Sequence, residues 1–169
     1  RLLQGDVGSG KTIVAMMSIL ISIDNNFQTC LVAPTEILAF QHFKKFKEIL
    51  SELNLNIQVL TGSSKTNERK KIHDELKSGS VNILIGTHAI FEDKVIFQNL
   101  GFAVIDEQHK FGVKQRSKIW KKNSPPPHIL IMTATPIPRT LTMSLYGDLD
   151  LSVIDELPPG RKKIKSRVL

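Results

Sequence analysis

Eight residues near the start of the chain have the types and the spacing that bind the phosphates of a nucleotide. They match the pattern G-x-x-x-x-G-K-S/T and are Gly5, Asp6, Val7, Gly8, Ser9, Gly10, Lys11 and Thr12. Glycines let the backbone turn its amides toward phosphate oxygens, and a helix beginning near Lys11 adds partial positive charge there. Lys11 should reach the β- and γ-phosphates, and the Thr12 hydroxyl should be a ligand of Mg²⁺. The alternative is a chance glycine-rich turn, but the apolar pair before the motif and the helical run after it favour a phosphate-binding loop.

Two adjacent carboxylates, Asp106 and Glu107, follow an apolar run at 102–105 that predicts a buried strand. Open α/β folds bind their ligands at the carboxyl ends of the strands, where this pair would lie. We expect Asp106 to hold Mg²⁺, through water, and Glu107 to orient and deprotonate an attacking water molecule. Taken alone, such a pair is more typical of the start of a helix. The phosphate-binding loop upstream reverses that preference.

Short apolar runs alternate with longer segments of helical period along the whole chain, which predicts an α/β fold with a mostly parallel sheet. The predicted strands are 29–33, 56–60, 81–85, 102–105, 129–132 and 151–154, with a further strand before Gly5. The predicted helices are 11–23, 36–53 and 65–77. In the second helix a stripe of apolar residues is expected to be core, namely Ile37, Phe40, Phe43, Phe46, Ile49, Leu50 and Leu53.

Composition places the chain among globular proteins of one domain. It has 169 residues, of which 41% are hydrophobic and 23% are charged. Its longest nearly apolar stretch, 13–23, is well short of the roughly 20 residues that cross a bilayer. A single cysteine, Cys30, excludes an internal disulfide, so we expect a reduced, intracellular protein. The net charge of +7 suits a polyanionic partner, although a basic surface without such a partner remains the alternative.

The order of the motifs resembles that of the superfamily 2 helicases. In that group a D-E-x-H motif and then a T-A-T motif follow the phosphate-binding loop, and in this chain they are at 106–109 and at Thr133-Ala134-Thr135. Within this group the chain is similar to the RecG family of bacterial DNA helicases. Besides the loop at 5–12, the stretches that carry this likeness are Ala33-Pro34-Thr35-Glu36-Ile37-Leu38-Ala39, Gly86-Thr87-His88, Asp106-Glu107-Gln108-His109-Lys110-Phe111-Gly112-Val113 and Met132-Thr133-Ala134-Thr135-Pro136-Ile137-Pro138-Arg139-Thr140. The transcription-repair coupling translocases share the last stretch but typically have a glutamate in place of Gln108. Lys110 departs from the arginine that is usual in the family.

The resemblance implies a three-layer, RecA-like P-loop NTPase domain with helices on both faces of the sheet. Residues 1–155 would be the first RecA-like domain, and 156–169 a linker toward a second one. ATP and Mg²⁺ would be the cofactors. DNA forks, Holliday junctions and duplex backbone would be the partners, together with a wedge domain and a second motor domain of a longer, cytoplasmic bacterial protein. The implied activity is ATP-driven translocation, fork regression and branch migration. Without the arginine finger of a second domain, we expect the fragment to hydrolyse ATP near background.

Two further sets of residues are carried over from the resemblance. The DNA-contacting set is Pro34, Thr35, Glu36, Thr61, Gly62, Gly86, Thr87 and His88, and the set that couples nucleotide state to DNA is Gln108, His109, Thr133 and Thr135. Each also has a structural interpretation: Thr35 as a helix cap, 61–63 as an ordinary turn, and 133–135 as a capped strand end.

The rival functions are an RNA helicase, because loops that follow a phosphate backbone do not distinguish the sugars, and a transcription-repair coupling translocase, because that group shares the stretch at 132–140. A GTPase is disfavoured because the chain has no Asn-Lys-x-Asp motif. A catalytically dead module is disfavoured because Lys11, Asp106 and Glu107 are all present.

Overall fold

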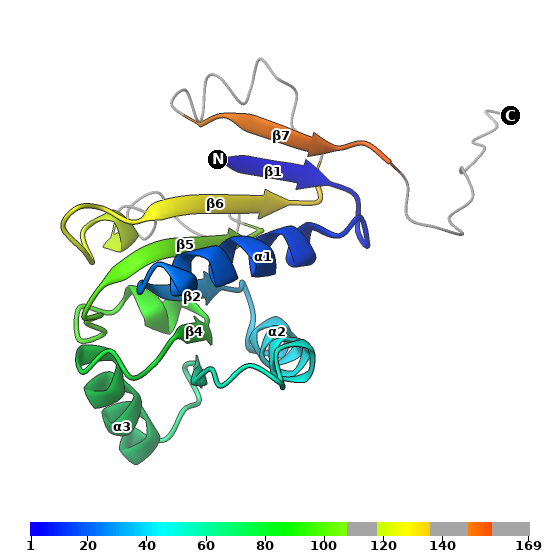
Figure 1. Ribbon diagram of the computed structural model, residues 1–169. Coiled ribbons are helices and arrows are strands. Elements are labelled where there is room, and N and C mark those ends of the chain that lie inside the picture. Colours follow the sequence, from blue (N-terminus) through cyan, green and yellow to red (C-terminus); the bar gives the residue numbers. More distant parts are fainter. Residues whose placement is uncertain (108–117, 136–148, 157–169) are drawn as a thin grey trace, which may run out of the picture.

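A computed structural model of the chain describes residues 1–107, 118–135 and 149–156, and its framework is a single sheet of seven strands (Figure 1). The strands are β1 (Leu2–Gly5), β2 (Gln28–Val32), β3 (Ile57–Leu60), β4 (Ile83–Gly86), β5 (Leu100–Asp106), β6 (His128–Thr133) and β7 (Leu151–Ile154). Their order across the sheet is β3-β4-β2-β5-β6-β1-β7, and each pairing is parallel. The predicted α/β class is therefore confirmed, and a strand lies at each predicted position.

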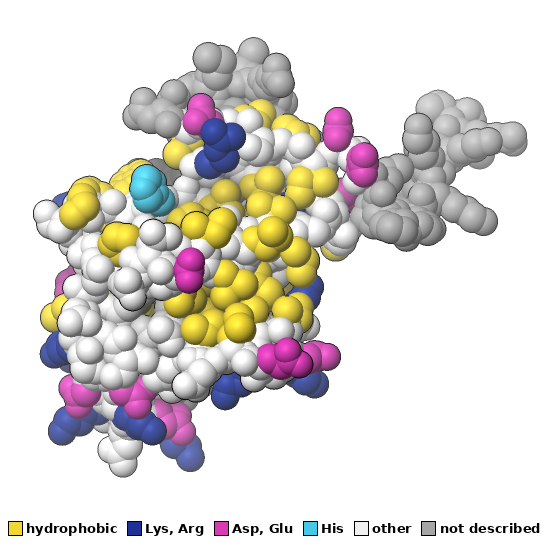
Figure 2. All heavy atoms as spheres, viewed as in Figure 1, with side chains coloured by type: hydrophobic (Ala, Val, Ile, Leu, Met, Phe, Trp, Pro, Cys, Tyr) yellow, Lys and Arg dark blue, Asp and Glu magenta, His cyan; other side chains and the backbone are white. Residues whose placement is uncertain are grey.

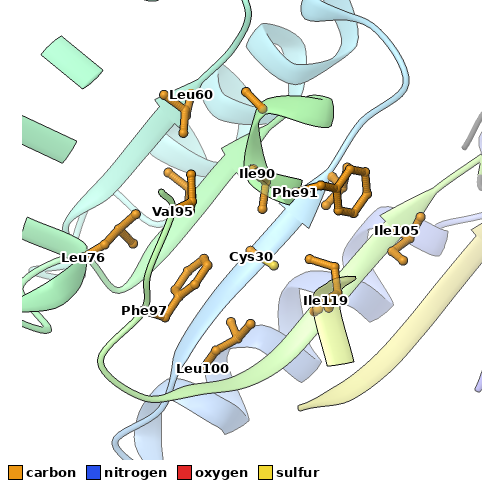
Figure 3. Close-up of a cluster of buried hydrophobic side chains, with 14 of the residues drawn as sticks. Cys30, Leu60, Leu76, Ile90, Phe91, Val95, Phe97, Leu100, Ile105 and Ile119 are labelled. Carbon is orange, nitrogen blue, oxygen red and sulfur yellow. The ribbon is translucent and has the colours of Figure 1, made fainter. Parts of the chain in front are cut away.

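Helices cover both faces of this sheet, which gives the predicted three layers. They are α1 (Lys11–Asp24), α2 (Glu36–Ile49) and α3 (Thr66–Lys77), with a short 3-10 helix, η1 (His88–Phe91). Side chains along a strand alternate between the two faces. Cys30 and Val32 of β2 accordingly join the core beneath α3 and η1, while Leu31 joins the core beneath α1 and α2. Figure 3 shows the first of these clusters, in which Cys30 lies among aliphatic and aromatic side chains.

Helix α2 departs from prediction at its end and on one of its faces. It ends at Ile49 rather than residue 53, because the chain turns after Leu50, where the Leu53 amide donates to the Leu50 carbonyl (3.0 Å). Phe46 and Leu50 are buried as expected, but Ile37 is 72% exposed and Phe40 is 48% exposed. The prediction of one buried stripe was therefore wrong for part of the helix.

Part of the predicted stripe is exposed because its residues lie at a different angle around the helix axis from those that meet the sheet. Ala39, Phe46 and Leu50 are buried and define the face of α2 that meets the sheet. They are seven and four residues apart, so they lie on one side of the helix. Phe40 is one residue after Ala39 and so lies about 100° further round the helix. Figure 2 shows exposed apolar side chains gathered over α1 and α2. No helix in the described part of the chain is long and apolar enough to span a membrane.

Candidate nucleotide and nucleic-acid site

The phosphate-binding loop joins the end of β1 to the start of α1, as the sequence predicts. Gly8 (φ +83°) and Gly10 (φ +94°) adopt the left-handed backbone that favours glycine, and Gly10 is the N-cap of α1. Gly5 has no room for a side chain, because a Cβ there would lie 2.5 Å from the Ser9 hydroxyl oxygen. The glycines of the motif are therefore required by the shape of the loop.

Two polar groups of the loop are arranged as a phosphate site requires. The Lys11 ammonium folds back over the loop and donates to the carbonyls of Gly5 (2.7 Å) and Asp6 (2.9 Å). The Ser9 hydroxyl is buried and has no hydrogen-bond partner among the described residues. A buried hydroxyl without a partner is costly, and a bound phosphate oxygen would supply the missing partner. These residues fit the phosphates of a nucleotide.

The acidic pair lies at the same edge of the sheet as the loop. Asp106 is the last residue of β5 and is level with Met132 of β6, while Thr133 of β6 is level with Gln4 of β1. Only β6 separates β5 from β1, and neighbouring strands are about 4.8 Å apart, so the two strand ends are about 10 Å apart. Thr12 is the second residue of α1, in the first turn above the loop. This arrangement brings Lys11, Thr12 and the acidic pair to one side of the molecule.

Glu107 is tied to β6 and to the residues that follow it. Its amide donates to the Met132 carbonyl (2.9 Å), and its carboxylate accepts from the Ala134 amide (2.9 Å) and the Thr133 hydroxyl (3.4 Å). The Thr135 amide in turn donates to the Thr133 hydroxyl oxygen (3.1 Å). The acid predicted to act on water is thus linked directly to the 133–135 segment. The predicted coupling residues Gln108 and His109 lie outside the described residues.

Asp106 has a partner that the sequence analysis missed. Nε2 of His42, on α2, lies 3.1 Å from Oδ2 of Asp106, and the two side chains are only 12% and 14% exposed. One feature of the sequence indicated that His42 would be buried. It lies four residues before Phe46, which places both on one face of the predicted helix. Nothing in the sequence named Asp106 as its partner.

The first two loops of the predicted DNA-contacting set are joined to each other. The Thr35 hydroxyl caps α2 by accepting from the Leu38 amide (3.3 Å). Glu36 accepts from the Ser63 amide (2.9 Å) and the Ser63 hydroxyl (2.7 Å), which ties the start of α2 to the turn after β3. The hydrogen bond from the Ser63 side chain, and then that from its backbone, lowers the pKa of the Glu36 carboxyl. Pro34 directly precedes this cap.

The third loop of this set lies beside the other two. Gly86 ends β4, and a Cβ on Gly62 would lie 3.9 Å from the His88 ring. Thr87 has a buried hydroxyl without a hydrogen-bond partner in the part of the chain that the structure describes, whereas His88 is exposed at the start of η1. Strands β3, β4 and β2 are neighbours, so their three loops form one half of the carboxyl edge. Strands β5, β6 and β1 carry the predicted nucleotide-binding residues on the other half.

The turn after β3 is held by an arginine on the following helix. Arg69 donates to the Thr61 carbonyl (3.1 Å), and its guanidinium also pairs with Glu92 (3.2 Å). Because Glu92 follows directly on η1, Arg69 connects the turn after β3 to the segment after β4. This role of Arg69 was not predicted from the sequence.

Comparisons of the sequence with known proteins all match helicases. The DEAD/DEAH box helicase family matches residues 1–144. The chain is 53% identical to the ATP-dependent DNA helicase RecG of Aquifex aeolicus (strain VF5), over 99% of this chain and 21% of that protein. It is 47% identical to the RecG of Thermotoga maritima, over 100% of this chain and 22% of that protein. The chain thus spans about a fifth of the length of these curated relatives.

Solved structures agree with the sequence relatives. The structure of RecG bound to a three-way DNA junction superimposes with a TM-score of 0.83 at 44% identity, over 97% of this chain and 22% of that chain. The helicase domain of Hef from Pyrococcus furiosus superimposes with a TM-score of 0.70 at 22% identity, over 90% of this chain and 34% of that chain. The second likeness concerns the fold alone.

Proposed function

This chain belongs to the DEAD/DEAH box helicase family, and from that premise we propose that it is the first RecA-like motor domain of a RecG-type DNA helicase. The observation that carries the proposal is the meeting of the phosphate-binding loop with Asp106 and Glu107 at one edge of the sheet. The identity of about half to RecG proteins over nearly the whole chain supports the RecG type.

In this proposal the chain binds and hydrolyses ATP. The loop amides and Lys11 hold the phosphates, and Lys11 exchanges its two carbonyl partners for phosphate oxygens. Thr12 and Asp106 are the residues that would hold Mg²⁺, which offsets the negative charge of the phosphates when it is bound. Glu107 accepts a proton from a water molecule while the oxygen of that water bonds to the γ-phosphorus. The bond from that phosphorus to the bridging oxygen then breaks, and ADP and phosphate leave.

The other half of the carboxyl edge would bind the DNA backbone. The proposed contacts come from Pro34, Thr35 and Glu36, from Thr61 and Gly62, and from Gly86, Thr87 and His88. Backbone amides and small hydroxyl side chains at strand ends suit phosphate oxygens and read no base, as expected of an enzyme that moves along DNA of any sequence. The buried, unpartnered Thr87 hydroxyl supports a ligand near this loop.

The wider activity of the whole protein is also part of the proposal. Residues 1–155 form the first motor domain and 156–169 lead toward a second, and a wedge domain completes the enzyme. That enzyme, in the bacterial cytoplasm, would couple ATP hydrolysis to fork regression and to branch migration of Holliday junctions. The junction-bound RecG structure and the greater length of the bacterial relatives support it. An arginine finger in trans contributes about 10³- to 10⁵-fold to phosphoryl transfer, so residues 1–169 alone should hydrolyse ATP near background.

The deciding experiment is an ATPase assay on the full protein with a DNA fork, a four-way DNA junction or single-stranded RNA. We expect the fork and the junction to stimulate hydrolysis and the RNA not to do so. Stronger stimulation by RNA would favour the RNA helicase interpretation. Stimulation by linear duplex alone, with no preference for branched DNA, would favour a coupling translocase. An absence of Mg²⁺-dependent ATP binding would reject the motor interpretation itself.

A further inference from the structure

We propose that His42 is a positioning residue for Asp106: it fixes one carboxylate oxygen, so that the other is presented to Mg²⁺. The inference rests on the proposed function, because it concerns how the predicted metal-holding carboxylate is oriented. It adds to the site a residue that lies on α2, outside the phosphate-binding loop and the Asp106-Glu107 pair.

The geometry of the contact defines what His42 can do. An ionised carboxylate only accepts hydrogen bonds, so the ring nitrogen Nε2 carries the hydrogen and donates to Asp106 Oδ2 over 3.1 Å. Within the described residues, no other hydrogen bond to this carboxylate occurs. One oxygen is therefore engaged, and the rotation of the carboxylate is restrained while its second oxygen is left for a ligand.

Stability alone is a weak reason for such a pair. The two side chains are 12% and 14% exposed, so both groups have lost most of their hydration. Half-buried and buried ionic pairs often contribute little net stability, because desolvation offsets the attraction between the charges. Partners that orient metal-binding carboxylates, in contrast, commonly change metal affinity by 10- to 100-fold when removed. The position of this pair, at the end of β5 and on the same edge of the sheet as the phosphate-binding loop, favours the second role.

The other described histidines differ from His42. His88 and His128 are exposed, and Nε2 of His73 is buried without a hydrogen-bond partner. Among the four histidines that the structure describes, His42 is the one whose ring pairs with a carboxylate. The pairing is thus specific to α2 and β5.

The test measures the Mg²⁺ requirement of nucleotide binding without turnover. The full protein is titrated with Mg²⁺ in the presence of a fluorescent, non-hydrolysable ATP analogue, as wild type and as His42→Leu, His42→Gln and His42→Asn. His128→Leu is the matched control, because it removes an exposed histidine at the opposite end of the sheet.

We expect His42→Leu to raise the half-saturating Mg²⁺ concentration about tenfold. Binding of the analogue without Mg²⁺ should stay unchanged, because Lys11 and the loop amides hold the phosphates. His42→Gln should restore the wild-type requirement, since its amide nitrogen reaches about as far as Nε2. The shorter His42→Asn should not restore it. His128→Leu should behave as wild type.

An unchanged Mg²⁺ requirement in His42→Leu, with a wild-type melting curve, would overturn the inference. If His42→Leu fails to fold, His42→Asn and His42→Gln decide, and equal Mg²⁺ requirements in those two variants would overturn it as well. Failure of the wild-type protein to bind the analogue with Mg²⁺ would reject the proposed function and this inference together, which is a distinguishable result.

Discussion

Glu107 is held in a strained backbone conformation by three hydrogen bonds to β6 and the residues after it. Its φ of +48° is unusual for a residue with a Cβ, and such conformations persist where the surroundings impose them. Here the Met132 carbonyl holds its amide, and Ala134 and Thr133 hold its carboxylate. The consequence is a carboxylate that is oriented before any substrate arrives.

Lys11→Ala and Glu107→Gln should abolish ATP hydrolysis in different ways. Lys11→Ala removes the ammonium that would bind the phosphates, so ATP binding should also be lost. Glu107→Gln keeps the shape of the side chain but cannot accept a proton, so ATP should bind and remain unhydrolysed. Filter binding and phosphate release with the full protein measure the two effects, with the exposed Glu52→Gln as control. Full turnover in the Glu107→Gln protein would remove Glu107 as the base.

Cys30 should be chemically inert while the protein is folded. Its thiol is buried in the cluster beneath α3 and η1, and burial raises its pKa to about 12. Only the thiolate reacts with alkylating agents, and a free cysteine ionises near pH 8.5. Iodoacetamide at pH 8 should therefore modify Cys30 in denaturing urea and leave Cys30 unmodified in the native protein, as read by mass spectrometry of the peptide that contains it. Equal rates in the two conditions would contradict the burial of Cys30.

Single residues differ in how far the sequence could predict them. The role of Gly8 and Gly10 follows from local backbone requirements, so the motif pattern was sufficient. The contact of His42 with Asp106 joins residues 64 positions apart and depends on how α2 lies on the sheet. No local pattern contains that information, which is why the partner of Asp106 was missed.

Helix α2 connects the two halves of the carboxyl edge. Its first residue, Glu36, contacts the turn after β3, and His42, less than two turns later, contacts the end of β5. The start of α2 was predictable because Thr35 is a capping residue. Its buried face was not, because apolar residues lie on more than one side of the helix and periodicity does not say which side meets the sheet.

Two phenylalanines of α2 offer a matched test of that face. Phe46 is 0% exposed and Phe40 is 48% exposed on the same helix. We expect Phe46→Ala to lower the free energy of unfolding by about 3 to 5 kcal/mol, since it removes a fully buried ring. Phe40→Ala should cost less than about 1 kcal/mol, as is usual for surface positions. Denaturant unfolding of the full protein measures both, and equal losses would contradict the orientation of α2.

The molecule as a whole carries an excess of positive charge and presents the loops proposed to bind ligands along one edge. The net charge is +7, and the described loops after β2, β3 and β4 are neighbours. The parallel sheet that creates this edge was predictable from the alternation of apolar runs and helical segments. The strand order, which separates the proposed nucleotide-binding residues from the proposed DNA-binding residues, was not predictable, because long-range pairing leaves no local pattern.

DNA binding by the full protein should weaken steeply as salt concentration rises. Each phosphate that the protein neutralises releases condensed counterions, so the logarithm of affinity falls by about 0.9 per phosphate contact for each unit of log salt. Fluorescence anisotropy with a labelled fork across a range of KCl concentrations measures the slope. Two unrelated fork sequences serve as the control, and they should give the same slope and affinity. A flat response would argue against contacts to the DNA backbone.

The pairing of β1 with β6 and β7 has a consequence for how the protein matures. β1 is the first of the seven strands to be synthesised, and its two neighbours are the last. Such distant partners give the sheet a high contact order, which slows folding. Strand β1, which leads into the phosphate-binding loop, therefore has no neighbouring strand to pair with until β6 has been synthesised. The half of the edge proposed to bind nucleotide is therefore completed after the strands of the half proposed to bind DNA have been made.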